Sequence, residues 1–152
     1  MREAIGGTWL FGLVITFIVF FASFLAVSVN YSKAFNVKNN VVDLISKYEG
    51  NNCQARKKIT EYLYTEGYIV PGTCPEDYTG YNQNGEESSG KSLYCIKSEK
   101  ISSEKTTLNK KYYRVVVFFK IDLPMFGNLT TFQVKGETES IYFATDNNKT
   151  SC

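Results

Sequence analysis

The stretch that decides the fold is residues 4–29, AIGGTWLFGLVITFIVFFASFLAVSV, which lies in a chain of 152 residues. It carries no charged side chain between Glu3 and Lys33. At about 1.5 Å per residue, a helix of this length crosses the roughly 30 Å hydrocarbon core of a bilayer. The sequence therefore predicts a transmembrane helix over residues 1–30.

Two interpretations of this stretch compete. Ala26-Val27-Ser28 is an acceptable cleavage site for a secretory signal peptide. However, the apolar core is much longer than the usual 7–15 residues, and only one basic residue precedes it. These features favour a retained single-pass helix.

A striped segment follows the apolar stretch without proline or internal glycine. Its apolar side chains recur at intervals of three and four residues: Tyr31, Ala34, Val37, Val41, Leu44, Ile45 and Tyr48. This spacing puts them on one face of a helix, and Gly50 is a stop signal. We expect one long helix over residues 5–49, with two helices hinged near Asn30 as the alternative.

The remainder, residues 31–152, is expected to be one α+β domain whose first part, 31–49, continues the long helix. A second helix is predicted from Cys53 to Glu66, and short or moderate strands at residues 68–70 and 93–101. The strongest strand is Tyr112–Leu123, in which Tyr113, Val115, Val117, Phe119 and Ile121 alternate onto one face. Another is expected over residues 129–143, with a bulge or close approach at Gly136.

The stripe and this strand are apolar surfaces that can bury each other, as when a helix covers one face of an antiparallel sheet. The predicted contact joins Val41, Leu44, Ile45 and Tyr48 of the helix to Val115, Val117 and Phe119 of the strand.

Four cysteines suggest disulfide bonds, because no CxxC pair is present and the domain follows a membrane segment. A bond between Cys74 and Cys95 would close a polar loop, leaving Cys53 and Cys152 as the default second pair. Four cysteines allow three connectivities, and buried free thiols in a cytoplasmic domain are the alternative.

The orientation of the helix is predicted from two opposing signals. Lys33, Lys38 and Lys47 outnumber Arg2, and the count of basic residues alone favours a cytoplasmic domain. The cysteines favour an oxidising compartment. We expect a cytoplasmic N-terminus and an extracytoplasmic domain attached to the cell membrane.

No enzymatic site is expected. The chain has no histidine, which removes the commonest general base and metal ligand, and it has no triad or phosphate-binding loop pattern. We expect no catalytic residue, cofactor, metal or small-molecule substrate. The net charge of +2 is too small to indicate nucleic acid as a partner.

The membrane helix, its amphipathic continuation and the small sheet together resemble the pilin-like proteins. The run YYRVVVFFKIDLPMFGNLTTFQVKGETESIYF, residues 112–143, is similar to the end of TadE/TadG-type minor pilins of tight-adherence pili. The resemblance covers residues 3–48 and 112–143. Pilin-like proteins usually carry a glutamate just inside the membrane helix, whereas Glu3 lies outside it here.

The resemblance implies a non-enzymatic subunit of a bacterial surface filament or secretion apparatus. Its partners would be the membrane and other pilin-like subunits or pilus assembly proteins. The alternative is a monomeric, single-pass, membrane-anchored binding domain outside the cytoplasm.

Overall fold

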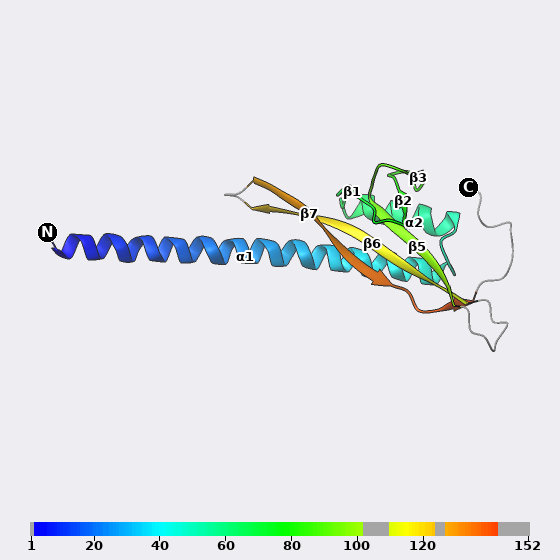
Figure 1. Cartoon of the computed structure of the whole chain (residues 1–152), viewed down its shortest axis with the longest axis horizontal. Coiled ribbons are helices and arrows are strands. Elements are labelled where there is room, and N and C mark those ends of the chain that lie inside the picture. The colour runs from blue at the N-terminus through cyan, green and yellow to red at the C-terminus, as the bar shows by residue number, and fades with distance from the viewer. Residues whose placement is uncertain (1, 102–109, 124–126, 143–152) are drawn as a thin grey trace.

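The computed structural model describes residues 2–101, 110–123 and 127–142 and has an α+β fold. A single helix, α1 (Arg2–Lys47), runs through 46 residues without a break. Its C-terminal half packs against an antiparallel sheet, while its N-terminal half projects from the domain (Figure 1). The long-helix interpretation is therefore confirmed, and there is no separate helix beginning near Asn30.

Helix α1 ends in a turn that closes on two backbone hydrogen bonds. The amide of Glu49 donates to the carbonyl of Ser46 at 3.1 Å, and the amide of Gly50 donates to Ile45 at 2.9 Å. This is the Schellman pattern, which requires a left-handed residue directly after the C-cap residue, here Tyr48. Glu49 adopts that conformation with φ of 56°. The sequence correctly predicts a stop here, but the left-handed residue at the first turn position is Glu49.

Helix α2 (Cys53–Thr65) starts at an asparagine cap. The side-chain oxygen of Asn52 accepts a hydrogen bond from the amide of Ala55 at 2.8 Å, which satisfies one of the free donors at the helix start. Ala55, Ile59 and Leu63, which recur at four-residue intervals, are buried together with Arg56.

The main sheet has the strand order β3-β2-β5-β6-β7, and all its pairings are antiparallel. Its strands are β2 (Thr79–Tyr81), β3 (Glu87–Ser88), β5 (Tyr94–Ile101), β6 (Lys110–Leu123) and β7 (Gly127–Glu137). A short strand, β8 (Ile141–Tyr142), pairs with the beginning of β6. Strands β1 (Gly72–Thr73) and β4 (Lys91–Ser92) form a separate two-stranded sheet.

The alternation predicted for β6 is present, and both of its faces are used. Tyr113, Val115, Val117 and Phe119 belong to the core shared with α1. On the reverse face, Val116 and Phe118 form a second core with Cys95. The burial of this second face was not predicted.

Three local predictions are wrong. Residues 68–70 do not form a strand, because the backbone begins to pair only at β1. The segment between Cys74 and Cys95, predicted as a polar loop, contains β2, β3 and β4. The final predicted strand divides into β7 and β8, and its residue 143 lies outside the described residues.

The division between β7 and β8 results from one extra residue. Residues 138–140 lie opposite residues 112–113 of β6, so the register shifts between the two strands. Thr138 bridges the gap: its Oγ1 accepts from the amide of Tyr113, and its own amide donates to the Tyr113 carbonyl, both at 2.9 Å. Gly136 itself pairs regularly with Val115. Of the two predictions for Gly136, a bulge or a close approach, the close approach is confirmed. The Lys38 side chain lies so close to Gly136 that a Cβ there would overlap it.

Candidate functional site: the apolar helix and its junction with the sheet

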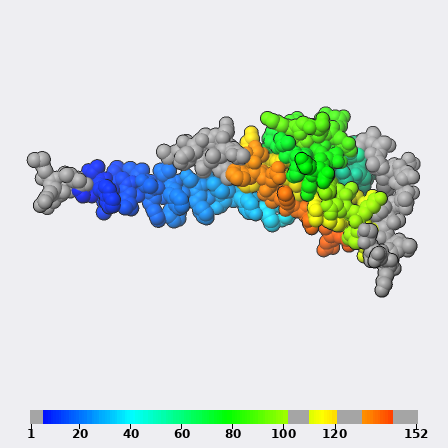
Figure 2. Space-filling model, in the orientation of Figure 1, coloured from blue at the N-terminus to red at the C-terminus, as the bar shows by residue number. Residues whose placement is uncertain are grey.

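The N-terminal half of α1 has no packing partner among the described residues. Among the described residues, α1 is the one helix that is long and apolar enough to cross a membrane, and its most apolar window has a mean hydropathy of 2.7 and is 0% buried. Figure 2 shows this half as a rod that extends away from the domain. Large side chains such as Trp9, Phe11 and Phe20 are between 65% and 76% exposed. A surface of this kind is stable only when lipid or other apolar groups cover it.

A strip of small residues runs along this exposed half. Thr8, Gly12 and Thr16 recur at intervals of four and lie in a shallow groove with Trp9, Leu13, Phe17 and Phe20. Nothing approaches within 4 Å of a Cβ built on Gly12, and the Thr16 hydroxyl donates to the Gly12 carbonyl at 2.9 Å. Small residues at this spacing let two membrane helices approach closely. The strip does not form a GxxxG motif, because two of its members are threonines.

The C-terminal half of α1 supplies one side of the main core. Val41, Ile45, Val115 and Val117 are completely buried, and Phe119 is 7% exposed. Leu44 and Tyr48 are both half-buried. Leu44 packs against the edge of this core, but Tyr48 does not belong to it. Tyr48 follows the last helical residue, and the turn at Glu49 carries the chain away from the stripe. The stripe therefore reaches only to Ile45.

Four aromatic rings meet where the two halves of α1 join. The ring of Tyr31 lies 6.4 Å from that of Phe35 and 5.9 Å from that of Phe119, measured between centroids. Phe119 stacks on Phe132 of β7 at 5.5 Å. We call Tyr31, Phe35, Phe119 and Phe132 the aromatic seam. The alternation of β6 predicts a core position for Phe119, but no sequence pattern predicts its ring contacts with Tyr31 and Phe132.

Lys38 extends the seam toward the domain. Its ammonium group lies 4.1 Å from the centre of the Phe35 ring, a cation–π contact. Its methylene groups lie over the backbone of Gly136, where a side chain would overlap them. The lysine thus covers apolar surface with its stem and leaves its charge at the border of the seam.

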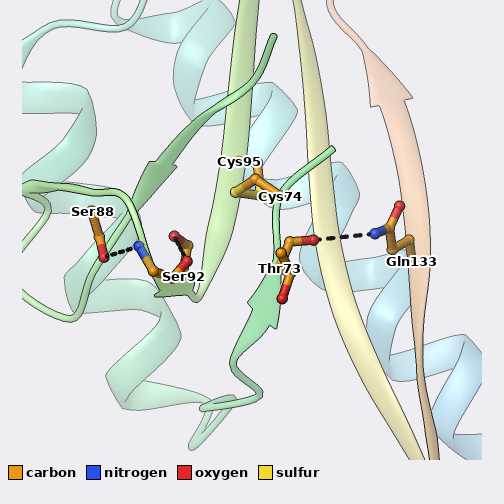
Figure 3. Close-up of a disulfide and its surroundings, with 7 residues drawn as sticks. Thr73, Cys74, Ser88, Ser92, Cys95 and Gln133 are labelled. Carbon is orange, nitrogen blue, oxygen red and sulfur yellow. Dashed lines mark hydrogen bonds between the residues drawn. A yellow bond between two sulfur atoms is a disulfide. The ribbon is translucent and has the colours of Figure 1, made fainter. Parts of the chain in front are cut away.

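The disulfide between Cys74 and Cys95 attaches the chain after β1 to strand β5 on the reverse face of the sheet. Its Cα atoms are 5.8 Å apart, and the two residues are separated by 21 positions in the sequence. Figure 3 shows it beside the hydrogen bond that the Gln133 side chain donates to the Thr73 carbonyl. Two attachments therefore hold the segment around β1 against the sheet.

Cys53 is also disulfide-bonded. Its predicted partner, Cys152, lies outside the described residues, so that pairing stays a prediction. No described cysteine is a free thiol.

Tyr68 strengthens the attachment of the same segment. Its hydroxyl donates to the Phe118 carbonyl at 2.5 Å, and burial raises the pKa of this hydroxyl well above its ordinary value. Burial raises the pKa of Tyr94 in the same way. Both phenols stay neutral at physiological pH. Tyr68 both packs and donates a hydrogen bond, whereas Tyr94 packs against the ring of Tyr81 at 5.2 Å between centroids.

A charged network covers the outer part of the reverse face. Glu99 accepts a hydrogen bond from the Tyr112 hydroxyl and forms ion pairs with Lys97 at 3.3 Å and Arg114 at 2.8 Å. Arg114 also pairs with Glu137 of β7 at 2.6 Å. The hydrogen bond from Tyr112 and the two cations lower the pKa of Glu99. The network links β5, β6 and β7 across the sheet.

An acidic groove lies between the solvent side of α1 and the β7–β8 connection. Its lining includes Asp43, Glu49, Glu137 and Glu139. No group of three or more His, Cys, Asp or Glu side chains with metal-binding geometry occurs in the described part of the chain. The groove therefore offers negative charge without a defined ligand set.

Comparisons with family models, curated proteins and solved structures found no match.

Proposed function

We propose that this chain is a non-enzymatic, membrane-anchored, pilin-like subunit of a bacterial surface filament or secretion apparatus. The observation that carries the proposal is the continuity of α1. One half of this helix is apolar and uncovered, and the other half is part of the core of a small domain. Such a helix couples a membrane position to a folded domain without a flexible linker.

The extracytoplasmic location of the domain is supported by its cysteines. Cys74 and Cys95 form a disulfide, and Cys53 is bonded as well. Disulfides persist in oxidising compartments and are rare in the cytoplasm. The proposal therefore places the N-terminus in the cytoplasm and the domain on the outer side of the cell membrane.

Assembly through α1 is supported by the small-residue strip. The strip lies on the projecting half of the helix, where no described residue packs. Bulky side chains surround it, so that a second helix could fit its ridges against Gly12. Van der Waals packing of this kind drives helix association in lipid, where the hydrophobic effect between helices is absent.

A cysteine cross-linking scan tests assembly directly. Because the described cysteines are bonded, a cysteine introduced into α1 adds a reactive thiol. In native membranes treated with a mild oxidant, Gly12→Cys and Thr16→Cys should give covalent dimers or adducts with another subunit. Val14→Cys and Ile18→Cys, on other faces of the same helix, are the matched controls and should react much less.

Equal cross-linking at all four positions, or none at any, would contradict assembly through this strip. It would favour the alternative of a monomeric membrane-anchored binding domain. The filament part of the proposal is tested by isolating surface filaments from cells with and without the gene. We expect the chain to co-purify with filament subunits, and its complete absence from these preparations would argue against a filament role.

A further inference from the structure

The face of α1 that packs on the sheet begins well inside the apolar stretch. Every residue from Gly6 to Ile18 is exposed. Half-buried side chains then recur at intervals of three and four residues, at Val19, Ser23, Ala26, Val27 and Asn30. This spacing leads directly into the buried stripe that starts at Ala34, and Val27 packs against the main core. One face of α1 is therefore shielded from Val19 onward.

The ends of β6 and β7 lie beside the same part of the helix. Tyr31 of α1 contacts Phe119 of β6, with ring centroids 5.9 Å apart. From Phe119, β6 continues to Leu123, which pairs with Gly127 at the start of β7. At about 3.3 Å per residue, these four residues cover roughly 13 Å, the length of about nine helical residues. The strand ends are therefore level with the region of Ala22, and Figure 1 shows them extending along α1 toward its N-terminus.

This end of the sheet is not compatible with the hydrocarbon core of a bilayer. Strand β7 is the last strand of the sheet, and no strand in the described part of the chain pairs with its outer edge. An open edge has unpaired backbone amide and carbonyl groups, for which hydrocarbon offers no hydrogen-bond partner. Lys120, which is exposed, and Asp122 add charged groups near the strand ends. The hydrocarbon core must therefore end on the N-terminal side of the strand ends.

The part of α1 that remains for the hydrocarbon core has the required length. Nineteen residues run from Ala4, which follows the charged Glu3, to Ala22. They form about 28 Å of helix, against a core of roughly 30 Å. The complete apolar stretch, residues 4–29, is about 39 Å long and exceeds the core by about 9 Å. Tilting the helix could take up this excess, but with Val29 in the hydrocarbon the strand ends would lie there too.

We propose that the hydrocarbon-spanning part of α1 ends near Ala22, and that residues 23–29 form a neck outside the hydrocarbon that holds the ends of β6 and β7 among the lipid headgroups. This inference rests on the proposed membrane anchorage. Phe24 and Leu25 then lie in the headgroup layer, which adds about 5–7 Å to the core on each side. Val29, about 10 Å beyond Ala22, lies at the outer border of that layer. Headgroups and their bound water suit the strand ends, because they can form hydrogen bonds with open backbone groups.

Thiol accessibility along one face of α1 tests where the hydrocarbon ends. Phe11, Ile18 and Val29 are 65%, 61% and 55% exposed, and at about 3.6 residues per turn they lie on the same side of the helix. Each is replaced by cysteine in the full-length chain, in which the described native cysteines are bonded. Membrane fragments open on both sides are treated with a membrane-impermeant maleimide, so the orientation of the helix does not affect the result. Each rate is normalised to the rate of the same variant in sodium dodecyl sulfate.

We expect Val29→Cys to react at least about tenfold faster than Ile18→Cys and the matched control Phe11→Cys, because maleimide reacts with the thiolate, which apolar surroundings disfavour. A Val29→Cys variant as slow as Phe11→Cys would place the whole apolar stretch in the hydrocarbon. That result would overturn the boundary and leave the membrane anchorage intact. A fast reaction at Ile18→Cys with a slow one at Phe11→Cys would move the boundary below Ile18 and overturn it as well. A fast reaction at Phe11→Cys would overturn the membrane anchorage itself.

Discussion

Gly72 sets how closely β1 approaches the sheet. A Cβ at this position would overlap the ring of Phe118, which is 1% exposed and cannot move outward. Gly136 presents a different case, because the atoms it would meet belong to the flexible stem of Lys38. The same change from glycine to alanine therefore has different consequences at the two sites.

We predict that Gly72→Ala lowers the free energy of unfolding by about 1–3 kcal/mol, the usual cost of overpacking a core. Gly90→Ala is the matched control, because the nearest atom to its Cβ is the Ser88 hydroxyl at 4.0 Å. Urea unfolding of both full-length variants in detergent, followed by circular dichroism, measures the difference. Equal stabilities would show that β1 does not pack on Phe118.

Glu99 makes the domain sensitive to acid. Its pKa is lowered in the folded state, chiefly by the hydrogen bond from Tyr112. The folded protein therefore binds fewer protons than the unfolded chain as pH falls through the ordinary glutamate range, so stability from this group is complete above that range and is lost below it.

We predict that Glu99→Gln flattens the decline of the unfolding free energy on the acid side of pH 4.5, the ordinary value for this group. Tyr112→Phe should flatten it in part, because it removes the hydrogen bond and leaves the two cations. Urea unfolding at a series of pH values measures these slopes. Slopes identical to that of the unmodified protein would mean that Glu99 has no lowered pKa.

At the scale of elements, sequence patterns predict the long segments well. The apolar run and the three-to-four spacing locate α1, and the alternation of β6 identifies its two faces correctly. Both patterns extend over many residues, so local deviations do not obscure them. The helix-facing core residues at 41, 45, 115, 117 and 119 follow from these two periodicities.

The short elements could not be predicted in the same way. Strands β1, β2, β3 and β4 have two or three residues each, and their pairing partners lie elsewhere in the chain. The aromatic seam also depends on residues that are distant in sequence, since Tyr31 and Phe132 are about a hundred residues apart. Both contact Phe119 only because α1 packs on β6 and β7. No local pattern contains such contacts.

The two halves of α1 should respond differently to one substitution. Ile45 is completely buried, whereas Ile18 is 61% exposed on the projecting half. We predict that Ile45→Ala destabilises the domain by about 2–5 kcal/mol, through lost burial and the cavity left behind. Ile18→Ala should leave the unfolding of the domain unchanged in detergent. Equal effects of the two changes would mean that the halves of α1 are not divided between anchor and core.

At the scale of the whole molecule, the disulfide joins the segment around β1 to the central strands. Reducing the Cys74–Cys95 bond, which spans 21 positions, should cost about 3 kcal/mol through the entropy gained by the unfolded chain. The Cys74→Ser/Cys95→Ser double variant, which leaves Cys53 in place, isolates this bond in the same urea assay. A double variant as stable as the original would show that the bond contributes no constraint.

The proposed function depends on α1 holding the domain at the outer face of a membrane. The most direct measurement is thiol labelling of a Tyr64→Cys variant, because Tyr64 lies on α2 and is 49% exposed. We expect the protein to remain in alkali-washed membranes and to react with a membrane-impermeant maleimide in intact cells, while the unmodified protein does not react. Release by alkali, or labelling that requires permeabilised cells, would contradict the account.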